Sequence, residues 1–134
     1  MSGDLSPATQ AFLNEHVEEY EDLEVLLLLF RHPERSWSAA EVAEHLRVSS
    51  DAVTDALAHM RSHALAESVP GPIPRFRYAA SQGGTCVEEL SAAYEHDRLR
   101  IIRRMNANAL ERLRTSAIRA FAEAFRLRKG RDDG

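Results

Sequence analysis

The sequence predicts a mainly α-helical fold with one short β-hairpin, in a chain of 134 residues. Apolar residues recur at helical spacing along most of the chain, and serines stand where several helices would begin. Only one stretch, RFRYAA from Arg75 to Ala80, alternates polar and apolar residues, and it follows a loop with three prolines. We therefore expect helices and a hairpin in residues 1–80, long amphipathic helices in 85–129 and a frayed tail at 130–134.

Two helices are expected at the N-terminus. Ser6 and Pro7 form a typical helix start, and Phe12, Leu13 and Val17 would be the buried residues of the first helix. The second, Tyr20–Arg31, is apolar nearly all round and would be the central core helix. Its apolar run is too short to cross a membrane, so no membrane span is expected.

A pair of short helices comes next. Ser38 and Glu41 form a capping box, which predicts a helix that buries Val42, Ala43 and Leu46. After a tight turn, Ser49 or Ser50 caps a second helix that reaches about Ala64. The inner face of this helix would be formed by four apolar residues at helical spacing: Val53, Ala56, Leu57 and Met60. Leu65–Val69 would then pair with RFRYAA as a hairpin.

The remaining chain predicts two long helices after a linker at 81–85. Thr85 and Glu88 form a second capping box for a helix to about Met105, and the sequence NAN at 106–108 is expected to interrupt it. Asn108 would cap a last helix, Ala109–Lys129, which Gly130 ends. Its apolar residues exceed what a small domain can cover, so we expect them to be buried in a homodimer: Leu110, Leu113, Ile118, Phe121 and Phe125.

The charge is divided unevenly along the chain. Residues 1–96 have a net charge of −10 and residues 97–134 a net charge of +6. The basic part is expected to face something acidic, which leaves open a nucleic acid, a partner or the protein's own acidic half.

The segment Ser38–Tyr78 resembles the winged helix–turn–helix superfamily. The resemblance is carried by small and apolar residues that pack two helices across each other: Ala43, Leu46, Val48, Ser49, Val53 and Leu57. Arg47 departs from the pattern, because many members have Gly at that turn. With helices on both sides, the whole is similar to MarR-type transcriptional regulators, whose terminal helices build a homodimer.

The resemblance implies that the helix Ser49–Ala64 enters a major groove and that the hairpin, the wing, touches phosphate or the minor groove. The implied DNA-binding residues are Ser49, Ser50, Thr54, His59, Arg47, Arg61, Arg75 and Arg77. The leading hypothesis is therefore a homodimeric transcriptional regulator that binds double-stranded DNA.

An alternative remains open, because the first turns of that helix carry Asp51 and Asp55 and no Arg or Lys. Carboxylates are repelled by phosphate, although they can accept a hydrogen bond from a cytosine amino group. The same fold could instead be a protein–protein adaptor that docks this acidic face on a basic partner. Arg75 and Arg77 would then be ordinary solvated residues.

No catalytic or cofactor site is predicted. His59 and His63 have a spacing that can bind a metal, but no third ligand is evident among the other histidines or the single cysteine, Cys86. The sequence contains no phosphate loop and no recognisable catalytic set, so we expect no enzyme, no metal and no cofactor. With one cysteine and no export signal, a cytoplasmic location is expected.

Overall fold

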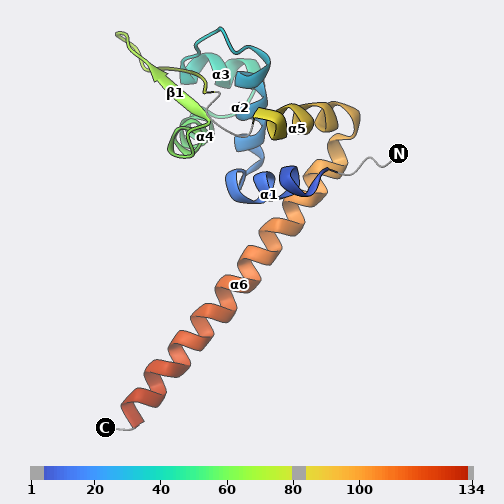
Figure 1. The fold of residues 1–134 in the computed structure, drawn as a ribbon. Helices are drawn as coiled ribbons and strands as arrows, with labels where there is room; N and C mark the ends of the chain where they lie inside the picture. The colour runs from blue at the N-terminus through green and yellow to red at the C-terminus, as the bar shows by residue number, and fades with distance from the viewer. Residues whose placement is uncertain (1–4, 80–83, 133–134) are drawn as a thin grey trace.

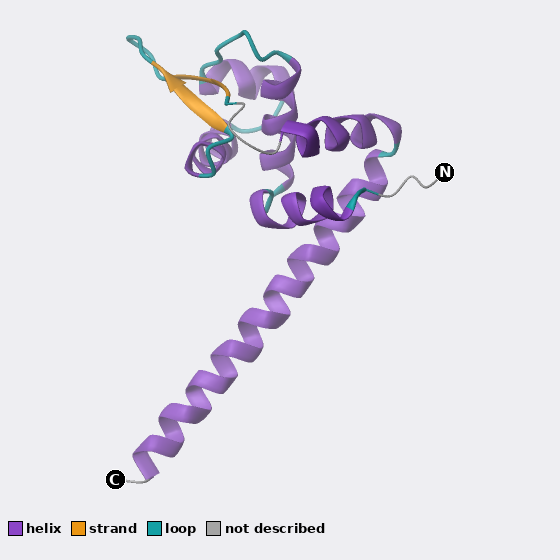
Figure 2. Cartoon of the chain, in the orientation of Figure 1, coloured by secondary structure: helices purple, strands orange, loops and turns teal. Residues whose placement is uncertain are grey.

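The computed structural model describes residues 5–79 and 84–132, and for 127–132 the backbone alone. A bundle of short helices with a small hairpin forms a compact body, and one long helix projects from it (Figures 1 and 2). In chain order the elements are α1 (Pro7–His16), α2 (Tyr20–Arg31), α3 (Ala39–Leu46), α4 (Ser50–Ser62), β1 (Ala66–Val69), β2 (Arg75–Tyr78), α5 (Gly84–His96) and α6 (Arg98–Asp132). The predicted mainly α fold with a hairpin wing is confirmed.

The central helix is α2, as its apolar sequence predicts. Leu23, Val25 and Leu29 are completely buried, and α2 packs against α4, β2 and α5. Burying each such side chain contributes roughly 1.5–3 kcal/mol, so α2 supplies much of the cohesion of the body.

The first helix is held at its start by a contact to a distant element. Ser6 caps α1, where its hydroxyl accepts the backbone N–H of Thr9 at 3.3 Å. The backbone N–H of Ser6 in turn donates to Oε1 of Glu89 in α5 at 2.6 Å, and its hydroxyl donates to Oε2 at 3.0 Å. These bonds fix α1 against α5.

The α3–turn–α4 unit forms by the local signals seen in the sequence. The hydroxyl of Ser38 accepts the N–H of Glu41 at 3.2 Å, and the Glu41 carboxylate accepts the N–H of Ser38 at 2.9 Å. Ser49 caps α4 by accepting the N–H of Ala52 at 3.2 Å. Arg47, between the two helices, has a φ of 58° and a ψ of 47°. This left-handed conformation is the one that Gly adopts at no steric cost.

The wing is a two-stranded antiparallel hairpin in which Ala66 pairs with Tyr78 and Val69 with Arg75. Trp37 extends it, because its backbone exchanges hydrogen bonds of 2.7 and 2.8 Å with Phe76. The buried ring of Trp37 lies edge-on to His45 of α3, the helix that follows it, and to His32, so Trp37 joins the loop, α3 and the wing.

The predicted helix boundaries after residue 80 were wrong. Helix α5 already includes Thr85, so Thr85 does not cap it, and α5 ends at His96 rather than near Met105. Asp97 makes the break, and its Oδ1 accepts the N–H of Arg100 at 3.2 Å as a helix cap does.

Helix α6 then runs through 106–108 without interruption and contains Asn108, the predicted cap, and Gly130, the predicted end. Asn costs only a few tenths of a kcal/mol inside a helix. Ile101 and Met105 are buried against the body, and this burial keeps the segment before residues 106–108 helical. The expected linker at 81–85 falls largely outside the described residues, as do residues 133–134.

Candidate nucleic-acid interface

The N-terminal half of α4 presents a hydroxyl-rich surface. Ser49, Ser50 and Thr54 are exposed, and so are Asp51 and Asp55. The hydroxyl groups can donate to phosphate or to base edges, whereas the carboxylates can only accept. The free N–H groups and the dipole at this helix start favour a negative group.

Two arginines flank this surface with uncommitted side chains. Arg47 precedes α4, Arg61 lies in its last turn, and both are exposed. Within the described ranges, no ion pair or side-chain hydrogen bond engages either guanidinium. They are therefore free to contact an anion.

Arg75, at the base of the wing, is bound internally. Its Nε donates to the hydroxyl of Ser36 at 3.1 Å, and its Nη2 donates to the carbonyl oxygen of Ser36 at 3.0 Å and to Oε1 of Glu41 at 2.6 Å. The hydrogen bond from the Ser38 backbone and the charge of Arg75 both lower the pKa of Glu41, the backbone bond most. Arg75 therefore ties the wing to the start of α3.

Arg77 lies opposite Glu67 across the hairpin, and its Nε donates to Oε1 of Glu67 at 2.6 Å. Both side chains are about half exposed, at 50% and 49%. An exposed pair of this kind is worth at most about 1 kcal/mol, so Arg77 can exchange Glu67 for another anion.

His59 is the one predicted contact residue that faces inward. Its Nε2 lies 2.9 Å from the carbonyl oxygen of His16 in α1 and 3.8 Å from Oδ2 of Asp22 in α2. The structure thus places Ser49, Ser50, Thr54 and Arg47 at the start of α4 and Arg61 in its last turn, and it places His59 against the body.

An apolar hollow of about 370 Å³ adjoins Thr54, between the start of α3, α4 and the wing. Its walls are mostly apolar: Ala39, Ala40, Leu57, Ile73, Pro74 and Phe76. Ile73 is 57% exposed. The sequence does not indicate this hollow, because the residues that line it come from α3, α4 and the wing, which are separate in the sequence.

The five apolar residues predicted for dimerisation form an uncovered stripe on α6. Leu110, Leu113, Ile118, Phe121 and Phe125 are each between 61% and 74% exposed. The rings of Phe121 and Phe125 stack with centroids 6.5 Å apart. On a helix that advances 100° per residue, Arg112, Arg119 and Arg126 lie on the opposite side.

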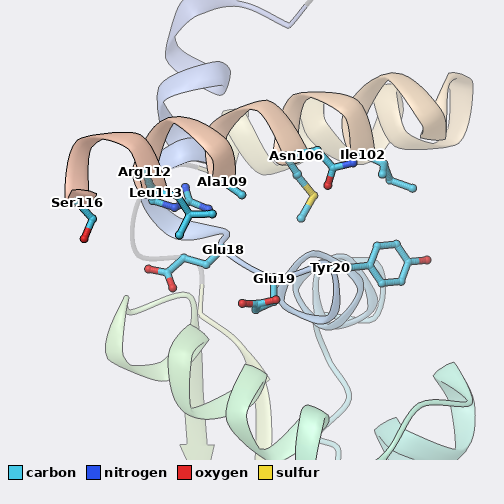
Figure 3. A pocket seen from close by; sticks show the side chains of 10 residues that line it. Glu18, Glu19, Tyr20, Ile102, Asn106, Ala109, Arg112, Leu113 and Ser116 are labelled. Carbon is cyan, nitrogen blue, oxygen red and sulfur yellow. The ribbon is translucent and has the colours of Figure 1, made fainter. Parts of the chain in front are cut away.

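A groove of about 560 Å³ lies where α6 leaves the body, between α6 and the junction of α1 and α2 (Figure 3). Ile102, Met105, Ala109 and Leu113 form its apolar wall, and Glu18 and Glu19 lie across from them. Leu113 belongs to both the groove and the stripe, so the two apolar surfaces are continuous.

Within the described ranges, no three His, Cys, Asp or Glu side chains are arranged to hold a metal ion. None of the helices in the described part of the chain is long and apolar enough to cross a membrane.

Comparisons with known proteins bear on the fold. No protein-family model matches the sequence, and no curated protein matches it significantly. Several solved structures are similar to the chain. MepR, a transcription regulator of the Staphylococcus aureus multidrug efflux pump MepA, aligns over 87% of this chain and 87% of its own with 13% identity and a TM-score of 0.53.

A variant of Lactococcus lactis ZitR covers 84% of this chain and 78% of its own with 19% identity and a TM-score of 0.52. HlyU from Vibrio cholerae covers 65% of this chain and 92% of its own, also with 19% identity and a TM-score of 0.52. At these identities the likeness concerns the fold. The chain has the winged helix–turn–helix fold with flanking helices, as its resemblance to MarR-type regulators predicts.

Proposed function

We propose that this protein is a homodimeric transcription regulator that binds double-stranded DNA through α4 and the wing. The observation that carries the proposal is the exposed surface of α4. Three hydroxyl groups lie at the helix start, Arg47 precedes them, Arg61 lies in the last turn, and neither guanidinium group is engaged within the described residues. A helix start of this kind fits a major groove, with the arginines on the flanking phosphates.

The proposed contacts fall into two groups. Ser49, Ser50, Thr54, Arg47 and Arg61 can reach DNA as they stand. Arg77 and Arg75 must first leave Glu67 and Glu41, so they contribute less. His59 is left out of the set, because it faces α1 and α2.

The carboxylates of Asp51 and Asp55 shape the expected binding. They repel phosphate, so affinity for arbitrary DNA should be low, and binding should depend on a site that offers cytosine amino groups to them. The proposed binding is therefore selective for DNA sequence, and its affinity should depend only weakly on salt concentration.

A second copy of the chain is the proposed cover for the apolar stripe of α6. The stripe is continuous with the groove at Leu113, and the acidic wall of that groove, Glu18 and Glu19, suits the arginine side of a partner α6. The proposed dimer would present two copies of α4, and dimers of this kind bind two half-sites about one helical turn of DNA apart. Such a role needs no catalytic group and belongs in the cytoplasm, with the genome.

Fluorescence anisotropy tests the DNA-binding proposal. The purified protein is titrated with labelled random-sequence duplex and with fragments from its own locus, over a salt series. We expect tighter binding to a locus fragment, and the slope of log affinity against log salt should fall by about 2 in Arg47→Ala plus Arg61→Ala.

The matched control is Arg103→Ala plus Arg104→Ala, which removes two exposed charges from α6 and should leave the slope unchanged. Absence of binding to every fragment at low salt would overturn the proposal. It would favour the second candidate, an adaptor that docks the acidic face of α4 on a basic protein.

A further inference from the structure

Three histidines from two helices meet on the inner side of α4. His16 is the last residue of α1, and His59 and His63 lie in the last turn and at the end of α4. The ring centroids of His59 and His63 are 4.3 Å apart, and those of His16 and His63 are 5.0 Å apart. In the sequence, His59 and His63 are 43 and 47 positions away from His16, so only the fold brings the three together.

Hydrogen bonds join these rings in a way that depends on protons. Nδ1 of His16 and Nδ1 of His63 are 2.8 Å apart. One of them must donate and the other accept, so the bond exists only while at least one ring is neutral. If both rings carry two protons, two N–H groups and two positive charges face each other. His59 adds a second bond between the helices, because its Nε2 donates to the carbonyl oxygen of His16 at 2.9 Å.

The surroundings of the cluster are both apolar and acidic. The ring of Phe12 packs on His16 with centroids 4.6 Å apart. Glu15 lies 3.8 Å from Nε2 of His16, and Asp22 of α2 lies 3.8 Å from Nε2 of His59. His59 also borders a hollow of about 390 Å³ whose carboxylates are Glu18, Glu19, Glu21, Asp22 and Asp55.

Burial lowers the pKa of His16 below its ordinary value of 6.5, and this effect is opposed by Glu15 and strengthened by His63 and His59. The neutral form of His16 therefore belongs to the linked state.

We propose that His16, His59 and His63 form a proton-operated link that holds α4 against α1 at neutral pH and releases it when the His16–His63 pair takes up a second proton. Because protonation favours the unlinked state, the link is complete above pH 6.5. It weakens as pH falls through 6.5 toward the lower pKa of His16 in the folded protein. The proposal rests on the proposed function only in naming α4 as the DNA-contacting helix.

Nuclear magnetic resonance of the full chain tests the link without DNA. Imidazole nitrogens and backbone amides are followed between about pH 8 and pH 5, the range in which imidazole titrates, with a metal chelator present. We expect His16 to titrate with a midpoint below 6.5. The amide shifts of α4 should follow the same midpoint.

His63→Gln should abolish the response of the α4 amides and leave a single-step titration of His16. His96→Gln is the matched control, because His96 is exposed at the end of α5, and it should behave as wild type. If His63→Gln loses helicity at neutral pH, His16→Gln replaces it. Amides of α4 that do not move with the titration of His16 would overturn the proposal.

Anisotropy then connects the link to DNA. Affinity of the wild type should fall at least about threefold between about pH 7.5 and pH 5.8, and this loss should be smaller in His63→Gln. A protein that binds no DNA at any pH would defeat the proposed function, and the imidazole titration would still decide the link. Equal losses in the wild type and in His63→Gln would overturn the role of the link in DNA binding.

Discussion

Arg75 and Glu41 form a 2.6 Å ion pair through a carboxylate oxygen that also accepts the backbone N–H of Ser38. One oxygen thus serves the cap of α3 and the anchor of the wing. The cap was evident from the sequence, whereas the anchor joins residues 34 positions apart and depends on the fold.

Glu41→Gln tests this double use. The amide carries no charge, so we expect a Tm a few degrees lower because both the cap and the wing anchor weaken. DNA should bind more tightly, because Arg75 is freed and one negative charge is lost near the interface. Circular dichroism melting and anisotropy measure the two effects. Glu44→Gln removes the same charge from an exposed position of α3, and an equal Tm in the two variants would contradict the shared role.

Arg47→Gly separates stability from DNA binding. Gly relieves the left-handed backbone at φ 58°, so the free energy of unfolding should rise by about 0.5–1 kcal/mol. Loss of the guanidinium should weaken DNA binding. Ala64 also has a positive φ, of 60°, and Ala64→Gly is the control that should stabilise without loss of affinity. Urea denaturation measures stability, and a destabilised Arg47→Gly would show that its side chain has an unrecognised structural role.

Phe121→Asp plus Phe125→Asp tests the dimer. Charges in the stripe should weaken self-association by at least about 30-fold, as expected for loss of two interface anchors. Sedimentation equilibrium measures it. Phe121→Leu plus Phe125→Leu keeps the stripe apolar and should remain dimeric. A wild-type protein that is monomeric at high concentration would exclude the second copy as the cover of this stripe.

Glu89→Gln should lower the free energy of unfolding at neutral pH and should have no effect on it in strong acid. The backbone N–H of Ser6 most strongly, and the hydroxyl of Ser6 as well, lower the pKa of Glu89 below 4.5. A depressed folded pKa gives stability that is complete above 4.5 and disappears as pH falls through the folded value. Denaturation at several pH values should therefore show a difference between wild type and Glu89→Gln that vanishes in strong acid. A difference that persists there would mean that the neutral carboxyl holds α1 equally well.

The elements set by neighbouring residues were predictable. The Ser38–Glu41 box, the cap at Ser49 and the hairpin after the proline loop were all confirmed, because each depends on residues within a few positions of one another. Even Arg47 gave a usable signal, since it stands where many winged helices have Gly. The sequence thus predicted the winged fold and the exposed start of α4.

The failures have a common physical cause. The break between α5 and α6 lies at Asp97, and α6 continues through 106–108, because Ile101 and Met105 are buried against the body and spacing alone does not show burial. The engagement of Arg75 and His59 depends on contacts with α3 and α1, far away in sequence. The contacts of His16 with His59 and His63 likewise depend on the fold, because these residues are 43 and 47 positions away from it.

Helix α6 also has a mechanical consequence. It is embedded in the body at Ile101 and Met105 and continues as one helix to Asp132, far beyond the other elements (Figure 1). At a rise of 1.5 Å per residue, the arm from Ile101 to its end is about 45 Å long. A tilt of about 5° at the base moves the tip by about 4 Å, roughly the length of one residue of extended chain. The long helix is thus a lever that turns a small rearrangement of the body into a large displacement of its far end.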